Sequence, residues 1–212
     1  MTGSPAPQAR TTFVSAILLA AGSSTRFGSP KLLAEVGGEP ILRRVIRAYC
    51  SAGVDQTLVV IPPQDTGSLH RSLRGVIEAA PGSVRWRVNE TAGGGMFTSV
   101  KAGLSSLDER TTHVAVSPAD LPFLRDESLR RILSAAAALD PRTLLVPTQA
   151  GRRGHPLVFC SALVPRLLSW ADGRRLSALF DEPDLGVVSL DGFGDDVLRD
   201  VDVPSDLTAA GT

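Results

Sequence analysis

The chain has 212 residues, enough for one hydrophobic core of ordinary size, so a second domain would have to be small. Lys and Arg together number 22, as do Asp and Glu, which leaves no net charge at neutral pH. A neutral chain lacks the long-range attraction that nucleic acid or an anionic membrane requires, so neither is an expected partner. Any anionic ligand would have to be held by local groups.

The sequence shows no pattern typical of secretion or membrane insertion. Its longest apolar stretch, residues 14–21, is far shorter than the roughly 20 residues that cross a bilayer. Residues 1–12 do not resemble a signal peptide and are predicted to be a disordered tail before a single domain at 13–208. Cys50 and Cys160 have neither metal-ligand nor disulfide spacing, which favours a reducing compartment. We therefore expect a cytoplasmic protein.

Short apolar runs rich in β-branched residues alternate with amphipathic stretches of helical length. This pattern predicts an α/β fold, a three-layer, Rossmann-like arrangement with a mostly parallel sheet covered on both faces. The expected strands are residues 13–19, 56–61, 84–88, 113–117, 144–147, 156–159 and 186–190. The expected helices are residues 41–52, 66–74, 96–107 and 126–139, and His70 is expected on the surface of the second. In such sheets ligands bind beyond the carboxyl ends of the strands.

The first expected strand continues into a loop rich in glycine and hydroxyl residues that carries two cations. Small residues let backbone N–H groups approach a triphosphate, and the cations offset its charge. The loop is not a P-loop, since the Gly-Lys-Ser/Thr ending is absent. On the loop alone, a solvated turn with two surface cations is an equal alternative. The candidate phosphate-binding residues are Leu19, Ala20, Ala21, Gly22 and Ser23, with Arg26 and Lys31 as the cations.

A second glycine cluster, residues 89–95, precedes the expected helix at 96. Successive glycines permit close approach of the backbone to a base or ribose, and the helix start offers unpaired N–H groups. A flexible linker is the alternative, and the cluster alone favours it. Asn89, Gly94 and Gly95 are the candidate nucleoside-binding residues here.

Carboxylates in two distant segments form a candidate metal site. Asp120 follows an expected buried strand, where a turn or N-cap aspartate is the alternative. Near the end of the chain, Asp200 and Asp202 would point to the same side of an extended segment, while Asp206 belongs to a turn after Pro204. Two carboxylates completed by water and phosphate oxygens are what Mg²⁺ prefers.

Gly151 and Gly154 enclose two arginines and indicate a tight turn between two strands. His155 then stands between Gly154 and Pro156, which would hold its ring in a definite direction. This turn is a candidate for contact with a second substrate, and a hairpin whose histidine packs or faces solvent is an equal alternative.

Together these residues resemble the family of molybdenum cofactor nucleotidyltransferases, which includes molybdopterin-guanine dinucleotide synthases, and most closely its cytidylyltransferase branch. The resemblance runs from Ala16 to Leu207. Its landmarks are Leu19-Ala20-Ala21-Gly22 with Arg26, Gly28 and Lys31; residues 37–42; Gly95-Met96 with Ser99 and Gly103-Leu104; Asp120-Leu121-Pro122; Gly154-His155-Pro156; and residues 202–207. Two features depart from the common pattern, namely Ala119 and Leu121 around the aspartate and the extra glycine in residues 93–95.

The resemblance implies a role for each landmark. Lys31 and Arg26 would lie near the triphosphate, and with Asp120 they are the implied catalytic residues. Asp120 and Asp202 would hold Mg²⁺. Gly94, Gly95 and Ser99 would lie beside the nucleoside, and Arg153, Gly154, His155 and Pro156 would face a pterin acceptor. Ala21, where the guanylyl branch has glycine, is typical of CTP users.

The implied reaction joins CMP from CTP to the terminal phosphate of a molybdopterin-type cofactor and releases pyrophosphate. A molybdoenzyme that receives the product is a candidate transient partner. One alternative is the same chemistry on a sugar phosphate or another phosphorylated small molecule. A protein that carries the cofactor without catalysis is the alternative of a different class.

Overall fold

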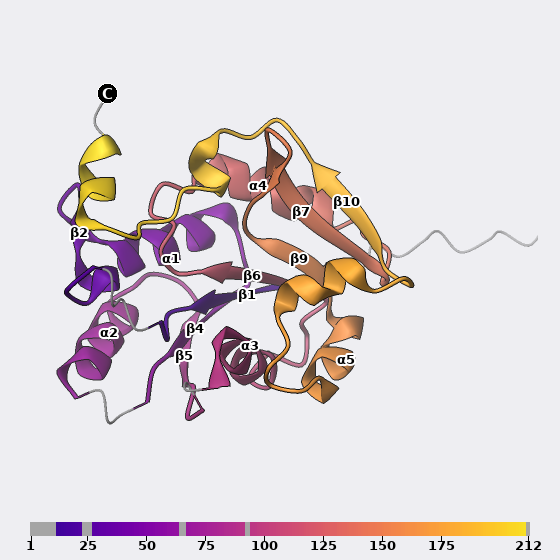
Figure 1. The fold of residues 1–212 in the computed structure, drawn as a ribbon, viewed down its shortest axis with the longest axis horizontal. Coiled ribbons are helices and arrows are strands. Elements are labelled where there is room, and N and C mark those ends of the chain that lie inside the picture. Colours follow the sequence, from indigo (N-terminus) through magenta and orange to yellow (C-terminus); the bar gives the residue numbers. More distant parts are fainter. Residues whose placement is uncertain (1–11, 23–26, 64–66, 92–93, 211–212) are drawn as a thin grey trace, which may run out of the picture.

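The computed structural model describes residues 12–22, 27–63, 67–91 and 94–210, without the side chains of 208–210. Its main sheet has eight strands in the order β10-β7-β9-β6-β1-β4-β5, with β8 paired to β7 (Figure 1). The strands are β1 (Val14–Leu19), β4 (Gln56–Ile61), β5 (Val84–Val88), β6 (His113–Pro118), β7 (Thr143–Gln149), β8 (Arg152–Arg153), β9 (Leu157–Cys160) and β10 (Gly186–Leu190). A small hairpin joins β2 (Glu35–Val36) to β3 (Glu39–Pro40).

Five α-helices lie within the described ranges: α1 (Ile41–Ala52), α2 (Ser68–Glu78), α3 (Met96–Leu104), α4 (Asp126–Ala136) and α5 (Val164–Ser169). Short 3-10 helices span Lys31–Leu33, Ser161–Leu163, Leu176–Asp181, Asp195–Val197 and Pro204–Ala210. None of the helices in these ranges has both the length and the apolar character needed to cross a membrane.

The sheet is mostly parallel, as predicted. Strands β5, β4, β1 and β6 pair in parallel, and so do β7 and β10. Strand β9 lies antiparallel between β6 and β7, and the short β8 is antiparallel to β7. The turn before β8 has positive φ at Ala150 (49°) and Gly151 (74°), so a tight turn between two strands is present as predicted. It lies before Arg152 and Arg153, which form β8 and do not belong to the turn.

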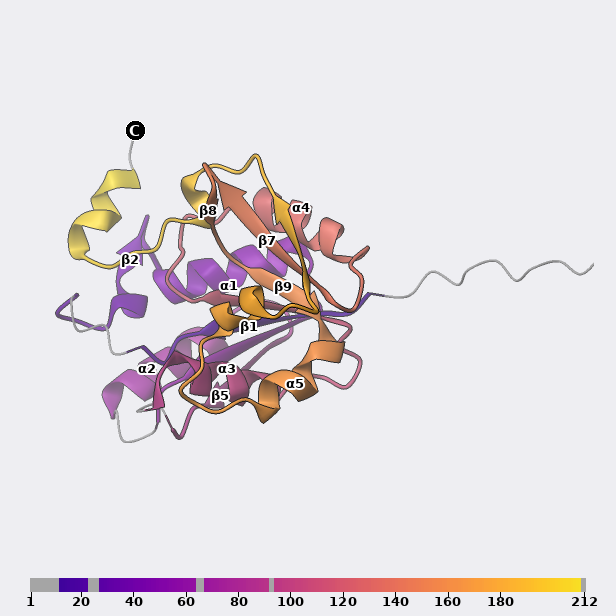
Figure 2. The ribbon, with the colours of Figure 1, turned by 45° about the vertical axis from the view of Figure 1, so that its right-hand side comes forward.

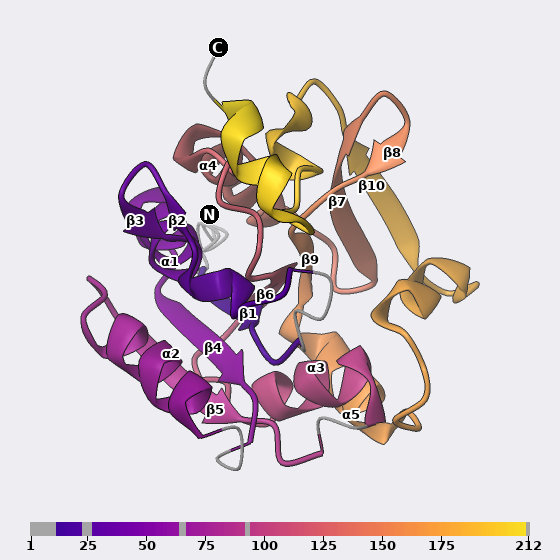
Figure 3. The same cartoon turned by 60° about the vertical axis from the view of Figure 1, so that its left-hand side comes forward.

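Helices cover both faces of the sheet. Helices α1, α2 and α4 share one hydrophobic core with one face, and α3 and α5 share a second core with the other, which gives three layers (Figures 2 and 3). Successive side chains of β1 point to opposite faces of the sheet, so each face contributes to its own core. Leu18 belongs to the first core, whereas Ile17 belongs to the second. All six residues of β4 are buried, as expected for a strand covered on both sides.

Glycine at position 103 lets α3 pack closely against the sheet. A Cβ on Gly103 would lie 2.6 Å from Cγ2 of Ile17 and 3.3 Å from Cγ2 of Val60, so a larger residue would push the helix away from β1 and β4. This contact gives a physical reason for the Gly103 landmark in the sequence.

Most expected elements are found within a few residues of their predicted bounds. The helices expected at 96–107 and 126–139 end earlier, at Leu104 and Ala136, and α5 was not predicted. The prediction that His70 lies on a helix surface is wrong. Its ring is buried between α2 and β5, where it lies edge-on to Trp86, with Nδ1 3.1 Å from the Pro62 carbonyl oxygen. The predicted tail, apart from Thr12, lies outside the described residues.

Candidate functional site

The candidate site lies at the carboxyl ends of the central strands. Leu19 and Pro118, the last residues of β1 and β6, are register partners, so the loops that follow the two strands begin side by side. The backbone N–H of Ala20 donates to the Val60 carbonyl at 2.8 Å, which fixes the start of the first loop against β4. Ala21 is half-buried and Gly22 is exposed. Ser23 and Arg26, both predicted site residues, lie outside the described residues.

Lys31, Asp120 and Asp202 meet at this edge. Lys31 Nζ lies 2.6 Å from Asp120 Oδ2 and 3.3 Å from Asp202 Oδ1, although these residues are 89 and 171 positions away along the chain. The backbone N–H of Val201 donates to the Asp120 carbonyl at 3.0 Å and thereby ties the last segment to the β6 loop. Burial alone would lower the pKa of Lys31, but hydrogen bonds and attraction from Asp120 and then Asp202 outweigh it and raise that pKa.

The carboxylates at this point suit a hard divalent cation. Asp120 Oδ1 is buried and has no hydrogen-bond partner among the described residues, so one acceptor atom is left for a ligand. Burial and, after it, repulsion from Asp120 and Asp202 raise the pKa of Asp200, so a third carboxyl group lies near the other two. No group of three or more His, Cys, Asp or Glu in the described part of the chain could hold a metal alone. Phosphate oxygens and water would therefore complete a site on Asp120 and Asp202.

Asp206 orients the segment that carries Asp202. Its Oδ2 accepts hydrogen bonds from the backbone N–H groups of Asp202 (2.8 Å) and Val203 (2.9 Å), and these bonds lower the pKa of Asp206. Asp206 lies in the 3-10 helix Pro204–Ala210, so its predicted place in a turn after Pro204 is confirmed. The sequence did not predict that this turn would set the direction of Asp202.

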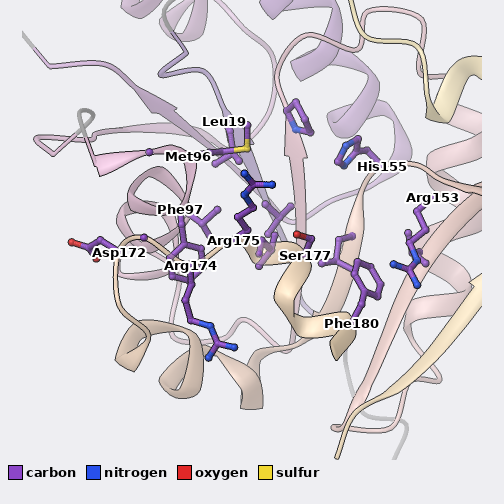
Figure 4. Close-up of a pocket in the computed structure, with 18 of the residues that line it drawn as sticks. Leu19, Met96, Phe97, Arg153, His155, Asp172, Arg174, Arg175, Ser177 and Phe180 are labelled. Carbon is purple, nitrogen blue, oxygen red and sulfur yellow. The ribbon is translucent and has the colours of Figure 1, made fainter. Parts of the chain in front are cut away.

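A cavity of about 670 Å³ opens at the same end of the sheet and is lined by the last residues of β1 and β6, Leu19 and Pro118 (Figure 4). Lys31, Asp120 and Asp202 do not themselves line it. Leu19, Gly94 and Gly95 line one side of it, and Arg153, Gly154 and His155 line another. Pro118, two residues before Asp120, also contributes. The remaining lining residues are largely apolar or come from the segment after α5: Met96, Phe97, Val100, Val116, Val146, Leu157, Asp172, Gly173, Arg174, Arg175, Leu176, Ser177 and Phe180. The structure thus brings the predicted nucleoside and acceptor sides to one cavity.

The turn at Gly154 is fixed by backbone contacts. Gly154 N–H donates to the Pro147 carbonyl at 2.7 Å, and His155 N–H donates to the Val197 carbonyl at 2.8 Å. A Cβ on Gly154 would lie 2.5 Å from that same carbonyl oxygen, so only glycine fits. Arg153 extends from the same turn and stacks over the Phe180 ring at 4.1 Å. Pro156, the last predicted residue of this turn, is buried.

His155 is one of the labelled side chains that line the cavity (Figure 4). Burial lowers the pKa of His155, and attraction to Asp120 only partly opposes this, which favours the neutral form of the ring. Its Nδ1 is buried and has no hydrogen-bond partner among the described residues. A neutral imidazole can donate or accept one hydrogen bond to a substrate group, but it brings no charge.

Asn89 and Ser99 are buried and do not line the cavity. Asn89 Nδ2 donates to Thr98 Oγ1 at 2.9 Å and to Ser99 Oγ at 2.8 Å, while its Oδ1 accepts from the backbone N–H of Thr91 at 3.0 Å. Their side chains therefore brace the backbone that presents Gly94 and Gly95. Any effect of Asn89 or Ser99 on a nucleotide would be indirect.

Comparison with known proteins supports one family. Residues 16–186 match the MobA-like NTP transferase domain. The chain is 31% identical to the bifunctional protein GlmU of Corynebacterium aurimucosum, across 91% of this chain and 39% of that protein. It is 35% identical to the bifunctional enzyme IspD/IspF of Anaeromyxobacter sp., across 74% and 40%, and 26% identical to the purine catabolism protein PucB of Bacillus subtilis, across 93% and 95%. The chain therefore spans about two fifths of the length of the first two relatives.

Solved structures share the fold. The crystal structure of Rv0371c from Mycobacterium tuberculosis has a TM-score of 0.74 and 24% identity, and the match covers 93% of this chain and 97% of that one. The complex of Rv0371c with manganese has a TM-score of 0.67 and 22% identity over the same shares. These likenesses confirm the predicted three-layer α/β fold.

Proposed function

The chain belongs to the family of MobA-like NTP transferase domains, and from this premise we propose that it transfers CMP from CTP to the terminal phosphate of a molybdopterin-type cofactor. Pyrophosphate is the second product. The observation that carries the proposal is the meeting of Lys31, Asp120 and Asp202 beside a cavity that joins Gly94 and Gly95 to the His155 turn. That arrangement brings a cation and two carboxylates to the end of the sheet where the cavity opens.

In this proposal, the protein chiefly positions and neutralises two anions. A phosphate monoester loses its second proton near pH ~6, so the acceptor phosphate is already a nucleophile at neutral pH and no strong base is required. Lys31 and Arg26 take up the charge that develops on the departing pyrophosphate. The backbone at Gly94 and Gly95 approaches the nucleoside without side-chain obstruction.

Asp120 and Asp202 would hold Mg²⁺. The assignment is supported by the buried Asp120 Oδ1, which has no hydrogen-bond partner among the described residues. A divalent cation there supplies positive charge that the triphosphate needs in order to react. The manganese complex of the similar protein Rv0371c also supports a divalent metal in this fold.

Nucleotide choice tests the cytidylyl part of the proposal. We expect CTP to bind more tightly than GTP because Ala21 stands where the guanylyl branch of the molybdenum cofactor nucleotidyltransferases has glycine. One methyl group in a pocket typically changes discrimination by about 1–3 kcal/mol, or roughly 5- to 150-fold in affinity. Calorimetric titration of both nucleotides checks this. Equal affinities, or tighter binding of GTP, would remove the cytidylyl assignment and leave the reaction class.

His155 tests the acceptor side. His155→Ala is expected to raise KM for the acceptor about tenfold, since one hydrogen bond from a desolvated group is lost, and to leave KM for CTP within about twofold. Steady-state pyrophosphate release at varied acceptor and then at varied CTP separates the two constants. If CTP binding weakens as much as acceptor use, His155 does not belong to the acceptor side.

A second candidate is the same transfer to another phosphorylated small molecule, such as a sugar phosphate. The similarity to GlmU and IspD/IspF, at 31% and 35% identity, favours it. A screen of phosphate esters for pyrophosphate release with CTP and Mg²⁺ distinguishes the candidates. Release with a sugar phosphate and none with molybdopterin cofactor would replace the first candidate by the second.

A further inference from the structure

One lysine bridges both carboxylates of the proposed metal site. Lys31 Nζ contacts Asp120 Oδ2 and Asp202 Oδ1, and the side chains of Lys31 and Asp120 are only 12% and 18% exposed. The ammonium group therefore stands between the same two carboxylates that would hold a divalent cation. The second acceptor atom of Asp120, Oδ1, has no hydrogen-bond partner among the described residues.

We propose that Lys31 competes with the metal for Asp120 and Asp202. Its ammonium group neutralises the two carboxylates in the substrate-free protein, and it moves from them to the triphosphate when a divalent cation binds. The inference rests on the proposed function for its metal site, and it assigns Lys31 two successive partners.

Electrostatics explains why the two cations compete. An ammonium group and a divalent cation that share the same carboxylates repel each other at a short distance. Solvent screens this repulsion less on the side of Asp120, which is 18% exposed, than on the side of Asp202, which is 49% exposed. Without any cation, Asp120 and Asp202, which both lie within 3.3 Å of the same ammonium nitrogen, would repel one another. Lys31 removes that cost in the substrate-free protein. Its four-carbon side chain is flexible enough to change partners while the backbone stays in place.

Triphosphate and metal should then bind cooperatively. A triphosphate offers Lys31 a new anionic partner, and the departure of Lys31 frees Asp120 and Asp202 for the cation. In the absence of nucleotide, by contrast, the metal must displace Lys31 with no compensation, so its affinity is low. Removing the ammonium group should therefore increase metal affinity, which is the opposite of what a simple helper of metal binding would show.

The test measures Mn²⁺ binding without nucleotide or acceptor, by counting free Mn²⁺ with electron paramagnetic resonance. Lys31→Met is expected to bind Mn²⁺ about tenfold or more tightly than the unchanged protein. Lys101→Met is the matched control. Lys101 is the other lysine of the chain, and it too bonds a carboxylate, Asp172, at 2.8 Å. The Lys101→Met variant should bind Mn²⁺ with an affinity within about twofold of that of the unchanged protein.

Two further variants secure the interpretation. Lys31→Gln keeps a polar donor and should also tighten Mn²⁺ binding, which covers the case in which Lys31→Met fails to fold. Adding Asp120→Asn to Lys31→Met should abolish the gain if the cation sits on Asp120. Equal or weaker Mn²⁺ binding in both Lys31 variants would overturn the proposal. The Mn²⁺ measurement involves no turnover. Tighter Mn²⁺ binding by the Lys31 variants, together with no pyrophosphate release by the unchanged protein, would therefore contradict only the proposed function.

Discussion

Asp120→Asn is expected to lower the rate of pyrophosphate release by about 10²–10³ or more, while the melting temperature changes little. Asparagine keeps the size of the side chain and removes the charge that would hold the cation. The fold should tolerate this because the backbone carbonyl of Asp120, which accepts from Val201, is unchanged. The lost ion pair with Lys31 is partly offset by relief of repulsion from Asp202 and Asp200. The measurement is the rate of pyrophosphate release at saturating Mg²⁺ and CTP, together with the melting temperature of the same variant.

Asp126→Asn is the control for Asp120→Asn. Asp126 is the half-exposed first residue of α4 and pairs with Arg130 at 3.0 Å, so its replacement should leave the rate unchanged. A purely structural Asp120 would give the reverse of the expected result, with a melting temperature lower by a few degrees and a near-normal rate. That outcome would remove the metal assignment.

Gly154→Ala is expected to destabilise the protein by about 1–3 kcal/mol and to impair use of the acceptor. The added Cβ would stand 2.5 Å from the Val197 carbonyl oxygen and 2.9 Å from Val197 Cγ2, and backbone atoms cannot rotate away. The turn would have to move, and the hydrogen bond from His155 N–H to Val197 would move with it. Denaturant unfolding and KM for the acceptor measure the two effects.

Gly75→Ala gives a matched comparison for Gly154→Ala. Gly75 lies inside α2, and a Cβ there would meet no atom within 4 Å. Alanine in such a helix position should raise stability by about 0.5–1 kcal/mol and leave the kinetics unchanged. If Gly154→Ala proves as stable as the unchanged protein, the close packing of the acceptor turn against Val197 is not a constraint on the fold.

The fold and part of the site follow from local patterns in the sequence. Buried runs such as 56–61 predict central strands because both faces must be covered, and the strand found is Gln56–Ile61. Since parallel strands end at one edge, the loop with Lys31 and the loop with Asp120 could be expected to meet there. The pattern near the end of the chain offered Asp200 and Asp202 together, and the resemblance to a known family singled out Asp202, which the structure brings to the same lysine.

Other features depend on tertiary contacts that no local pattern carries. Residues 172–180 form one wall of the cavity. They belong to a short 3-10 helix and to the segment that precedes it, and neither has a repeating apolar pattern. Asn89 carries a polar side chain suited to a ligand, but its hydrogen bonds to Thr98 and Ser99 turn it inward. His70 is buried because α2 turns that side toward Trp86. In each case the surrounding chain decides the direction of the side chain.

The most direct test of the proposed function is mass spectrometry of the reaction products. The protein is incubated with CTP, Mg²⁺ and isolated molybdopterin cofactor, and the released pyrophosphate is counted in the same sample. The proposal predicts one pyrophosphate for each cofactor molecule that gains the mass of a CMP group, and no such product with Asp120→Asn. If no acceptor gains a nucleotidyl group from CTP or any other triphosphate, while the cofactor still binds, the protein is a carrier and the proposed catalysis is contradicted.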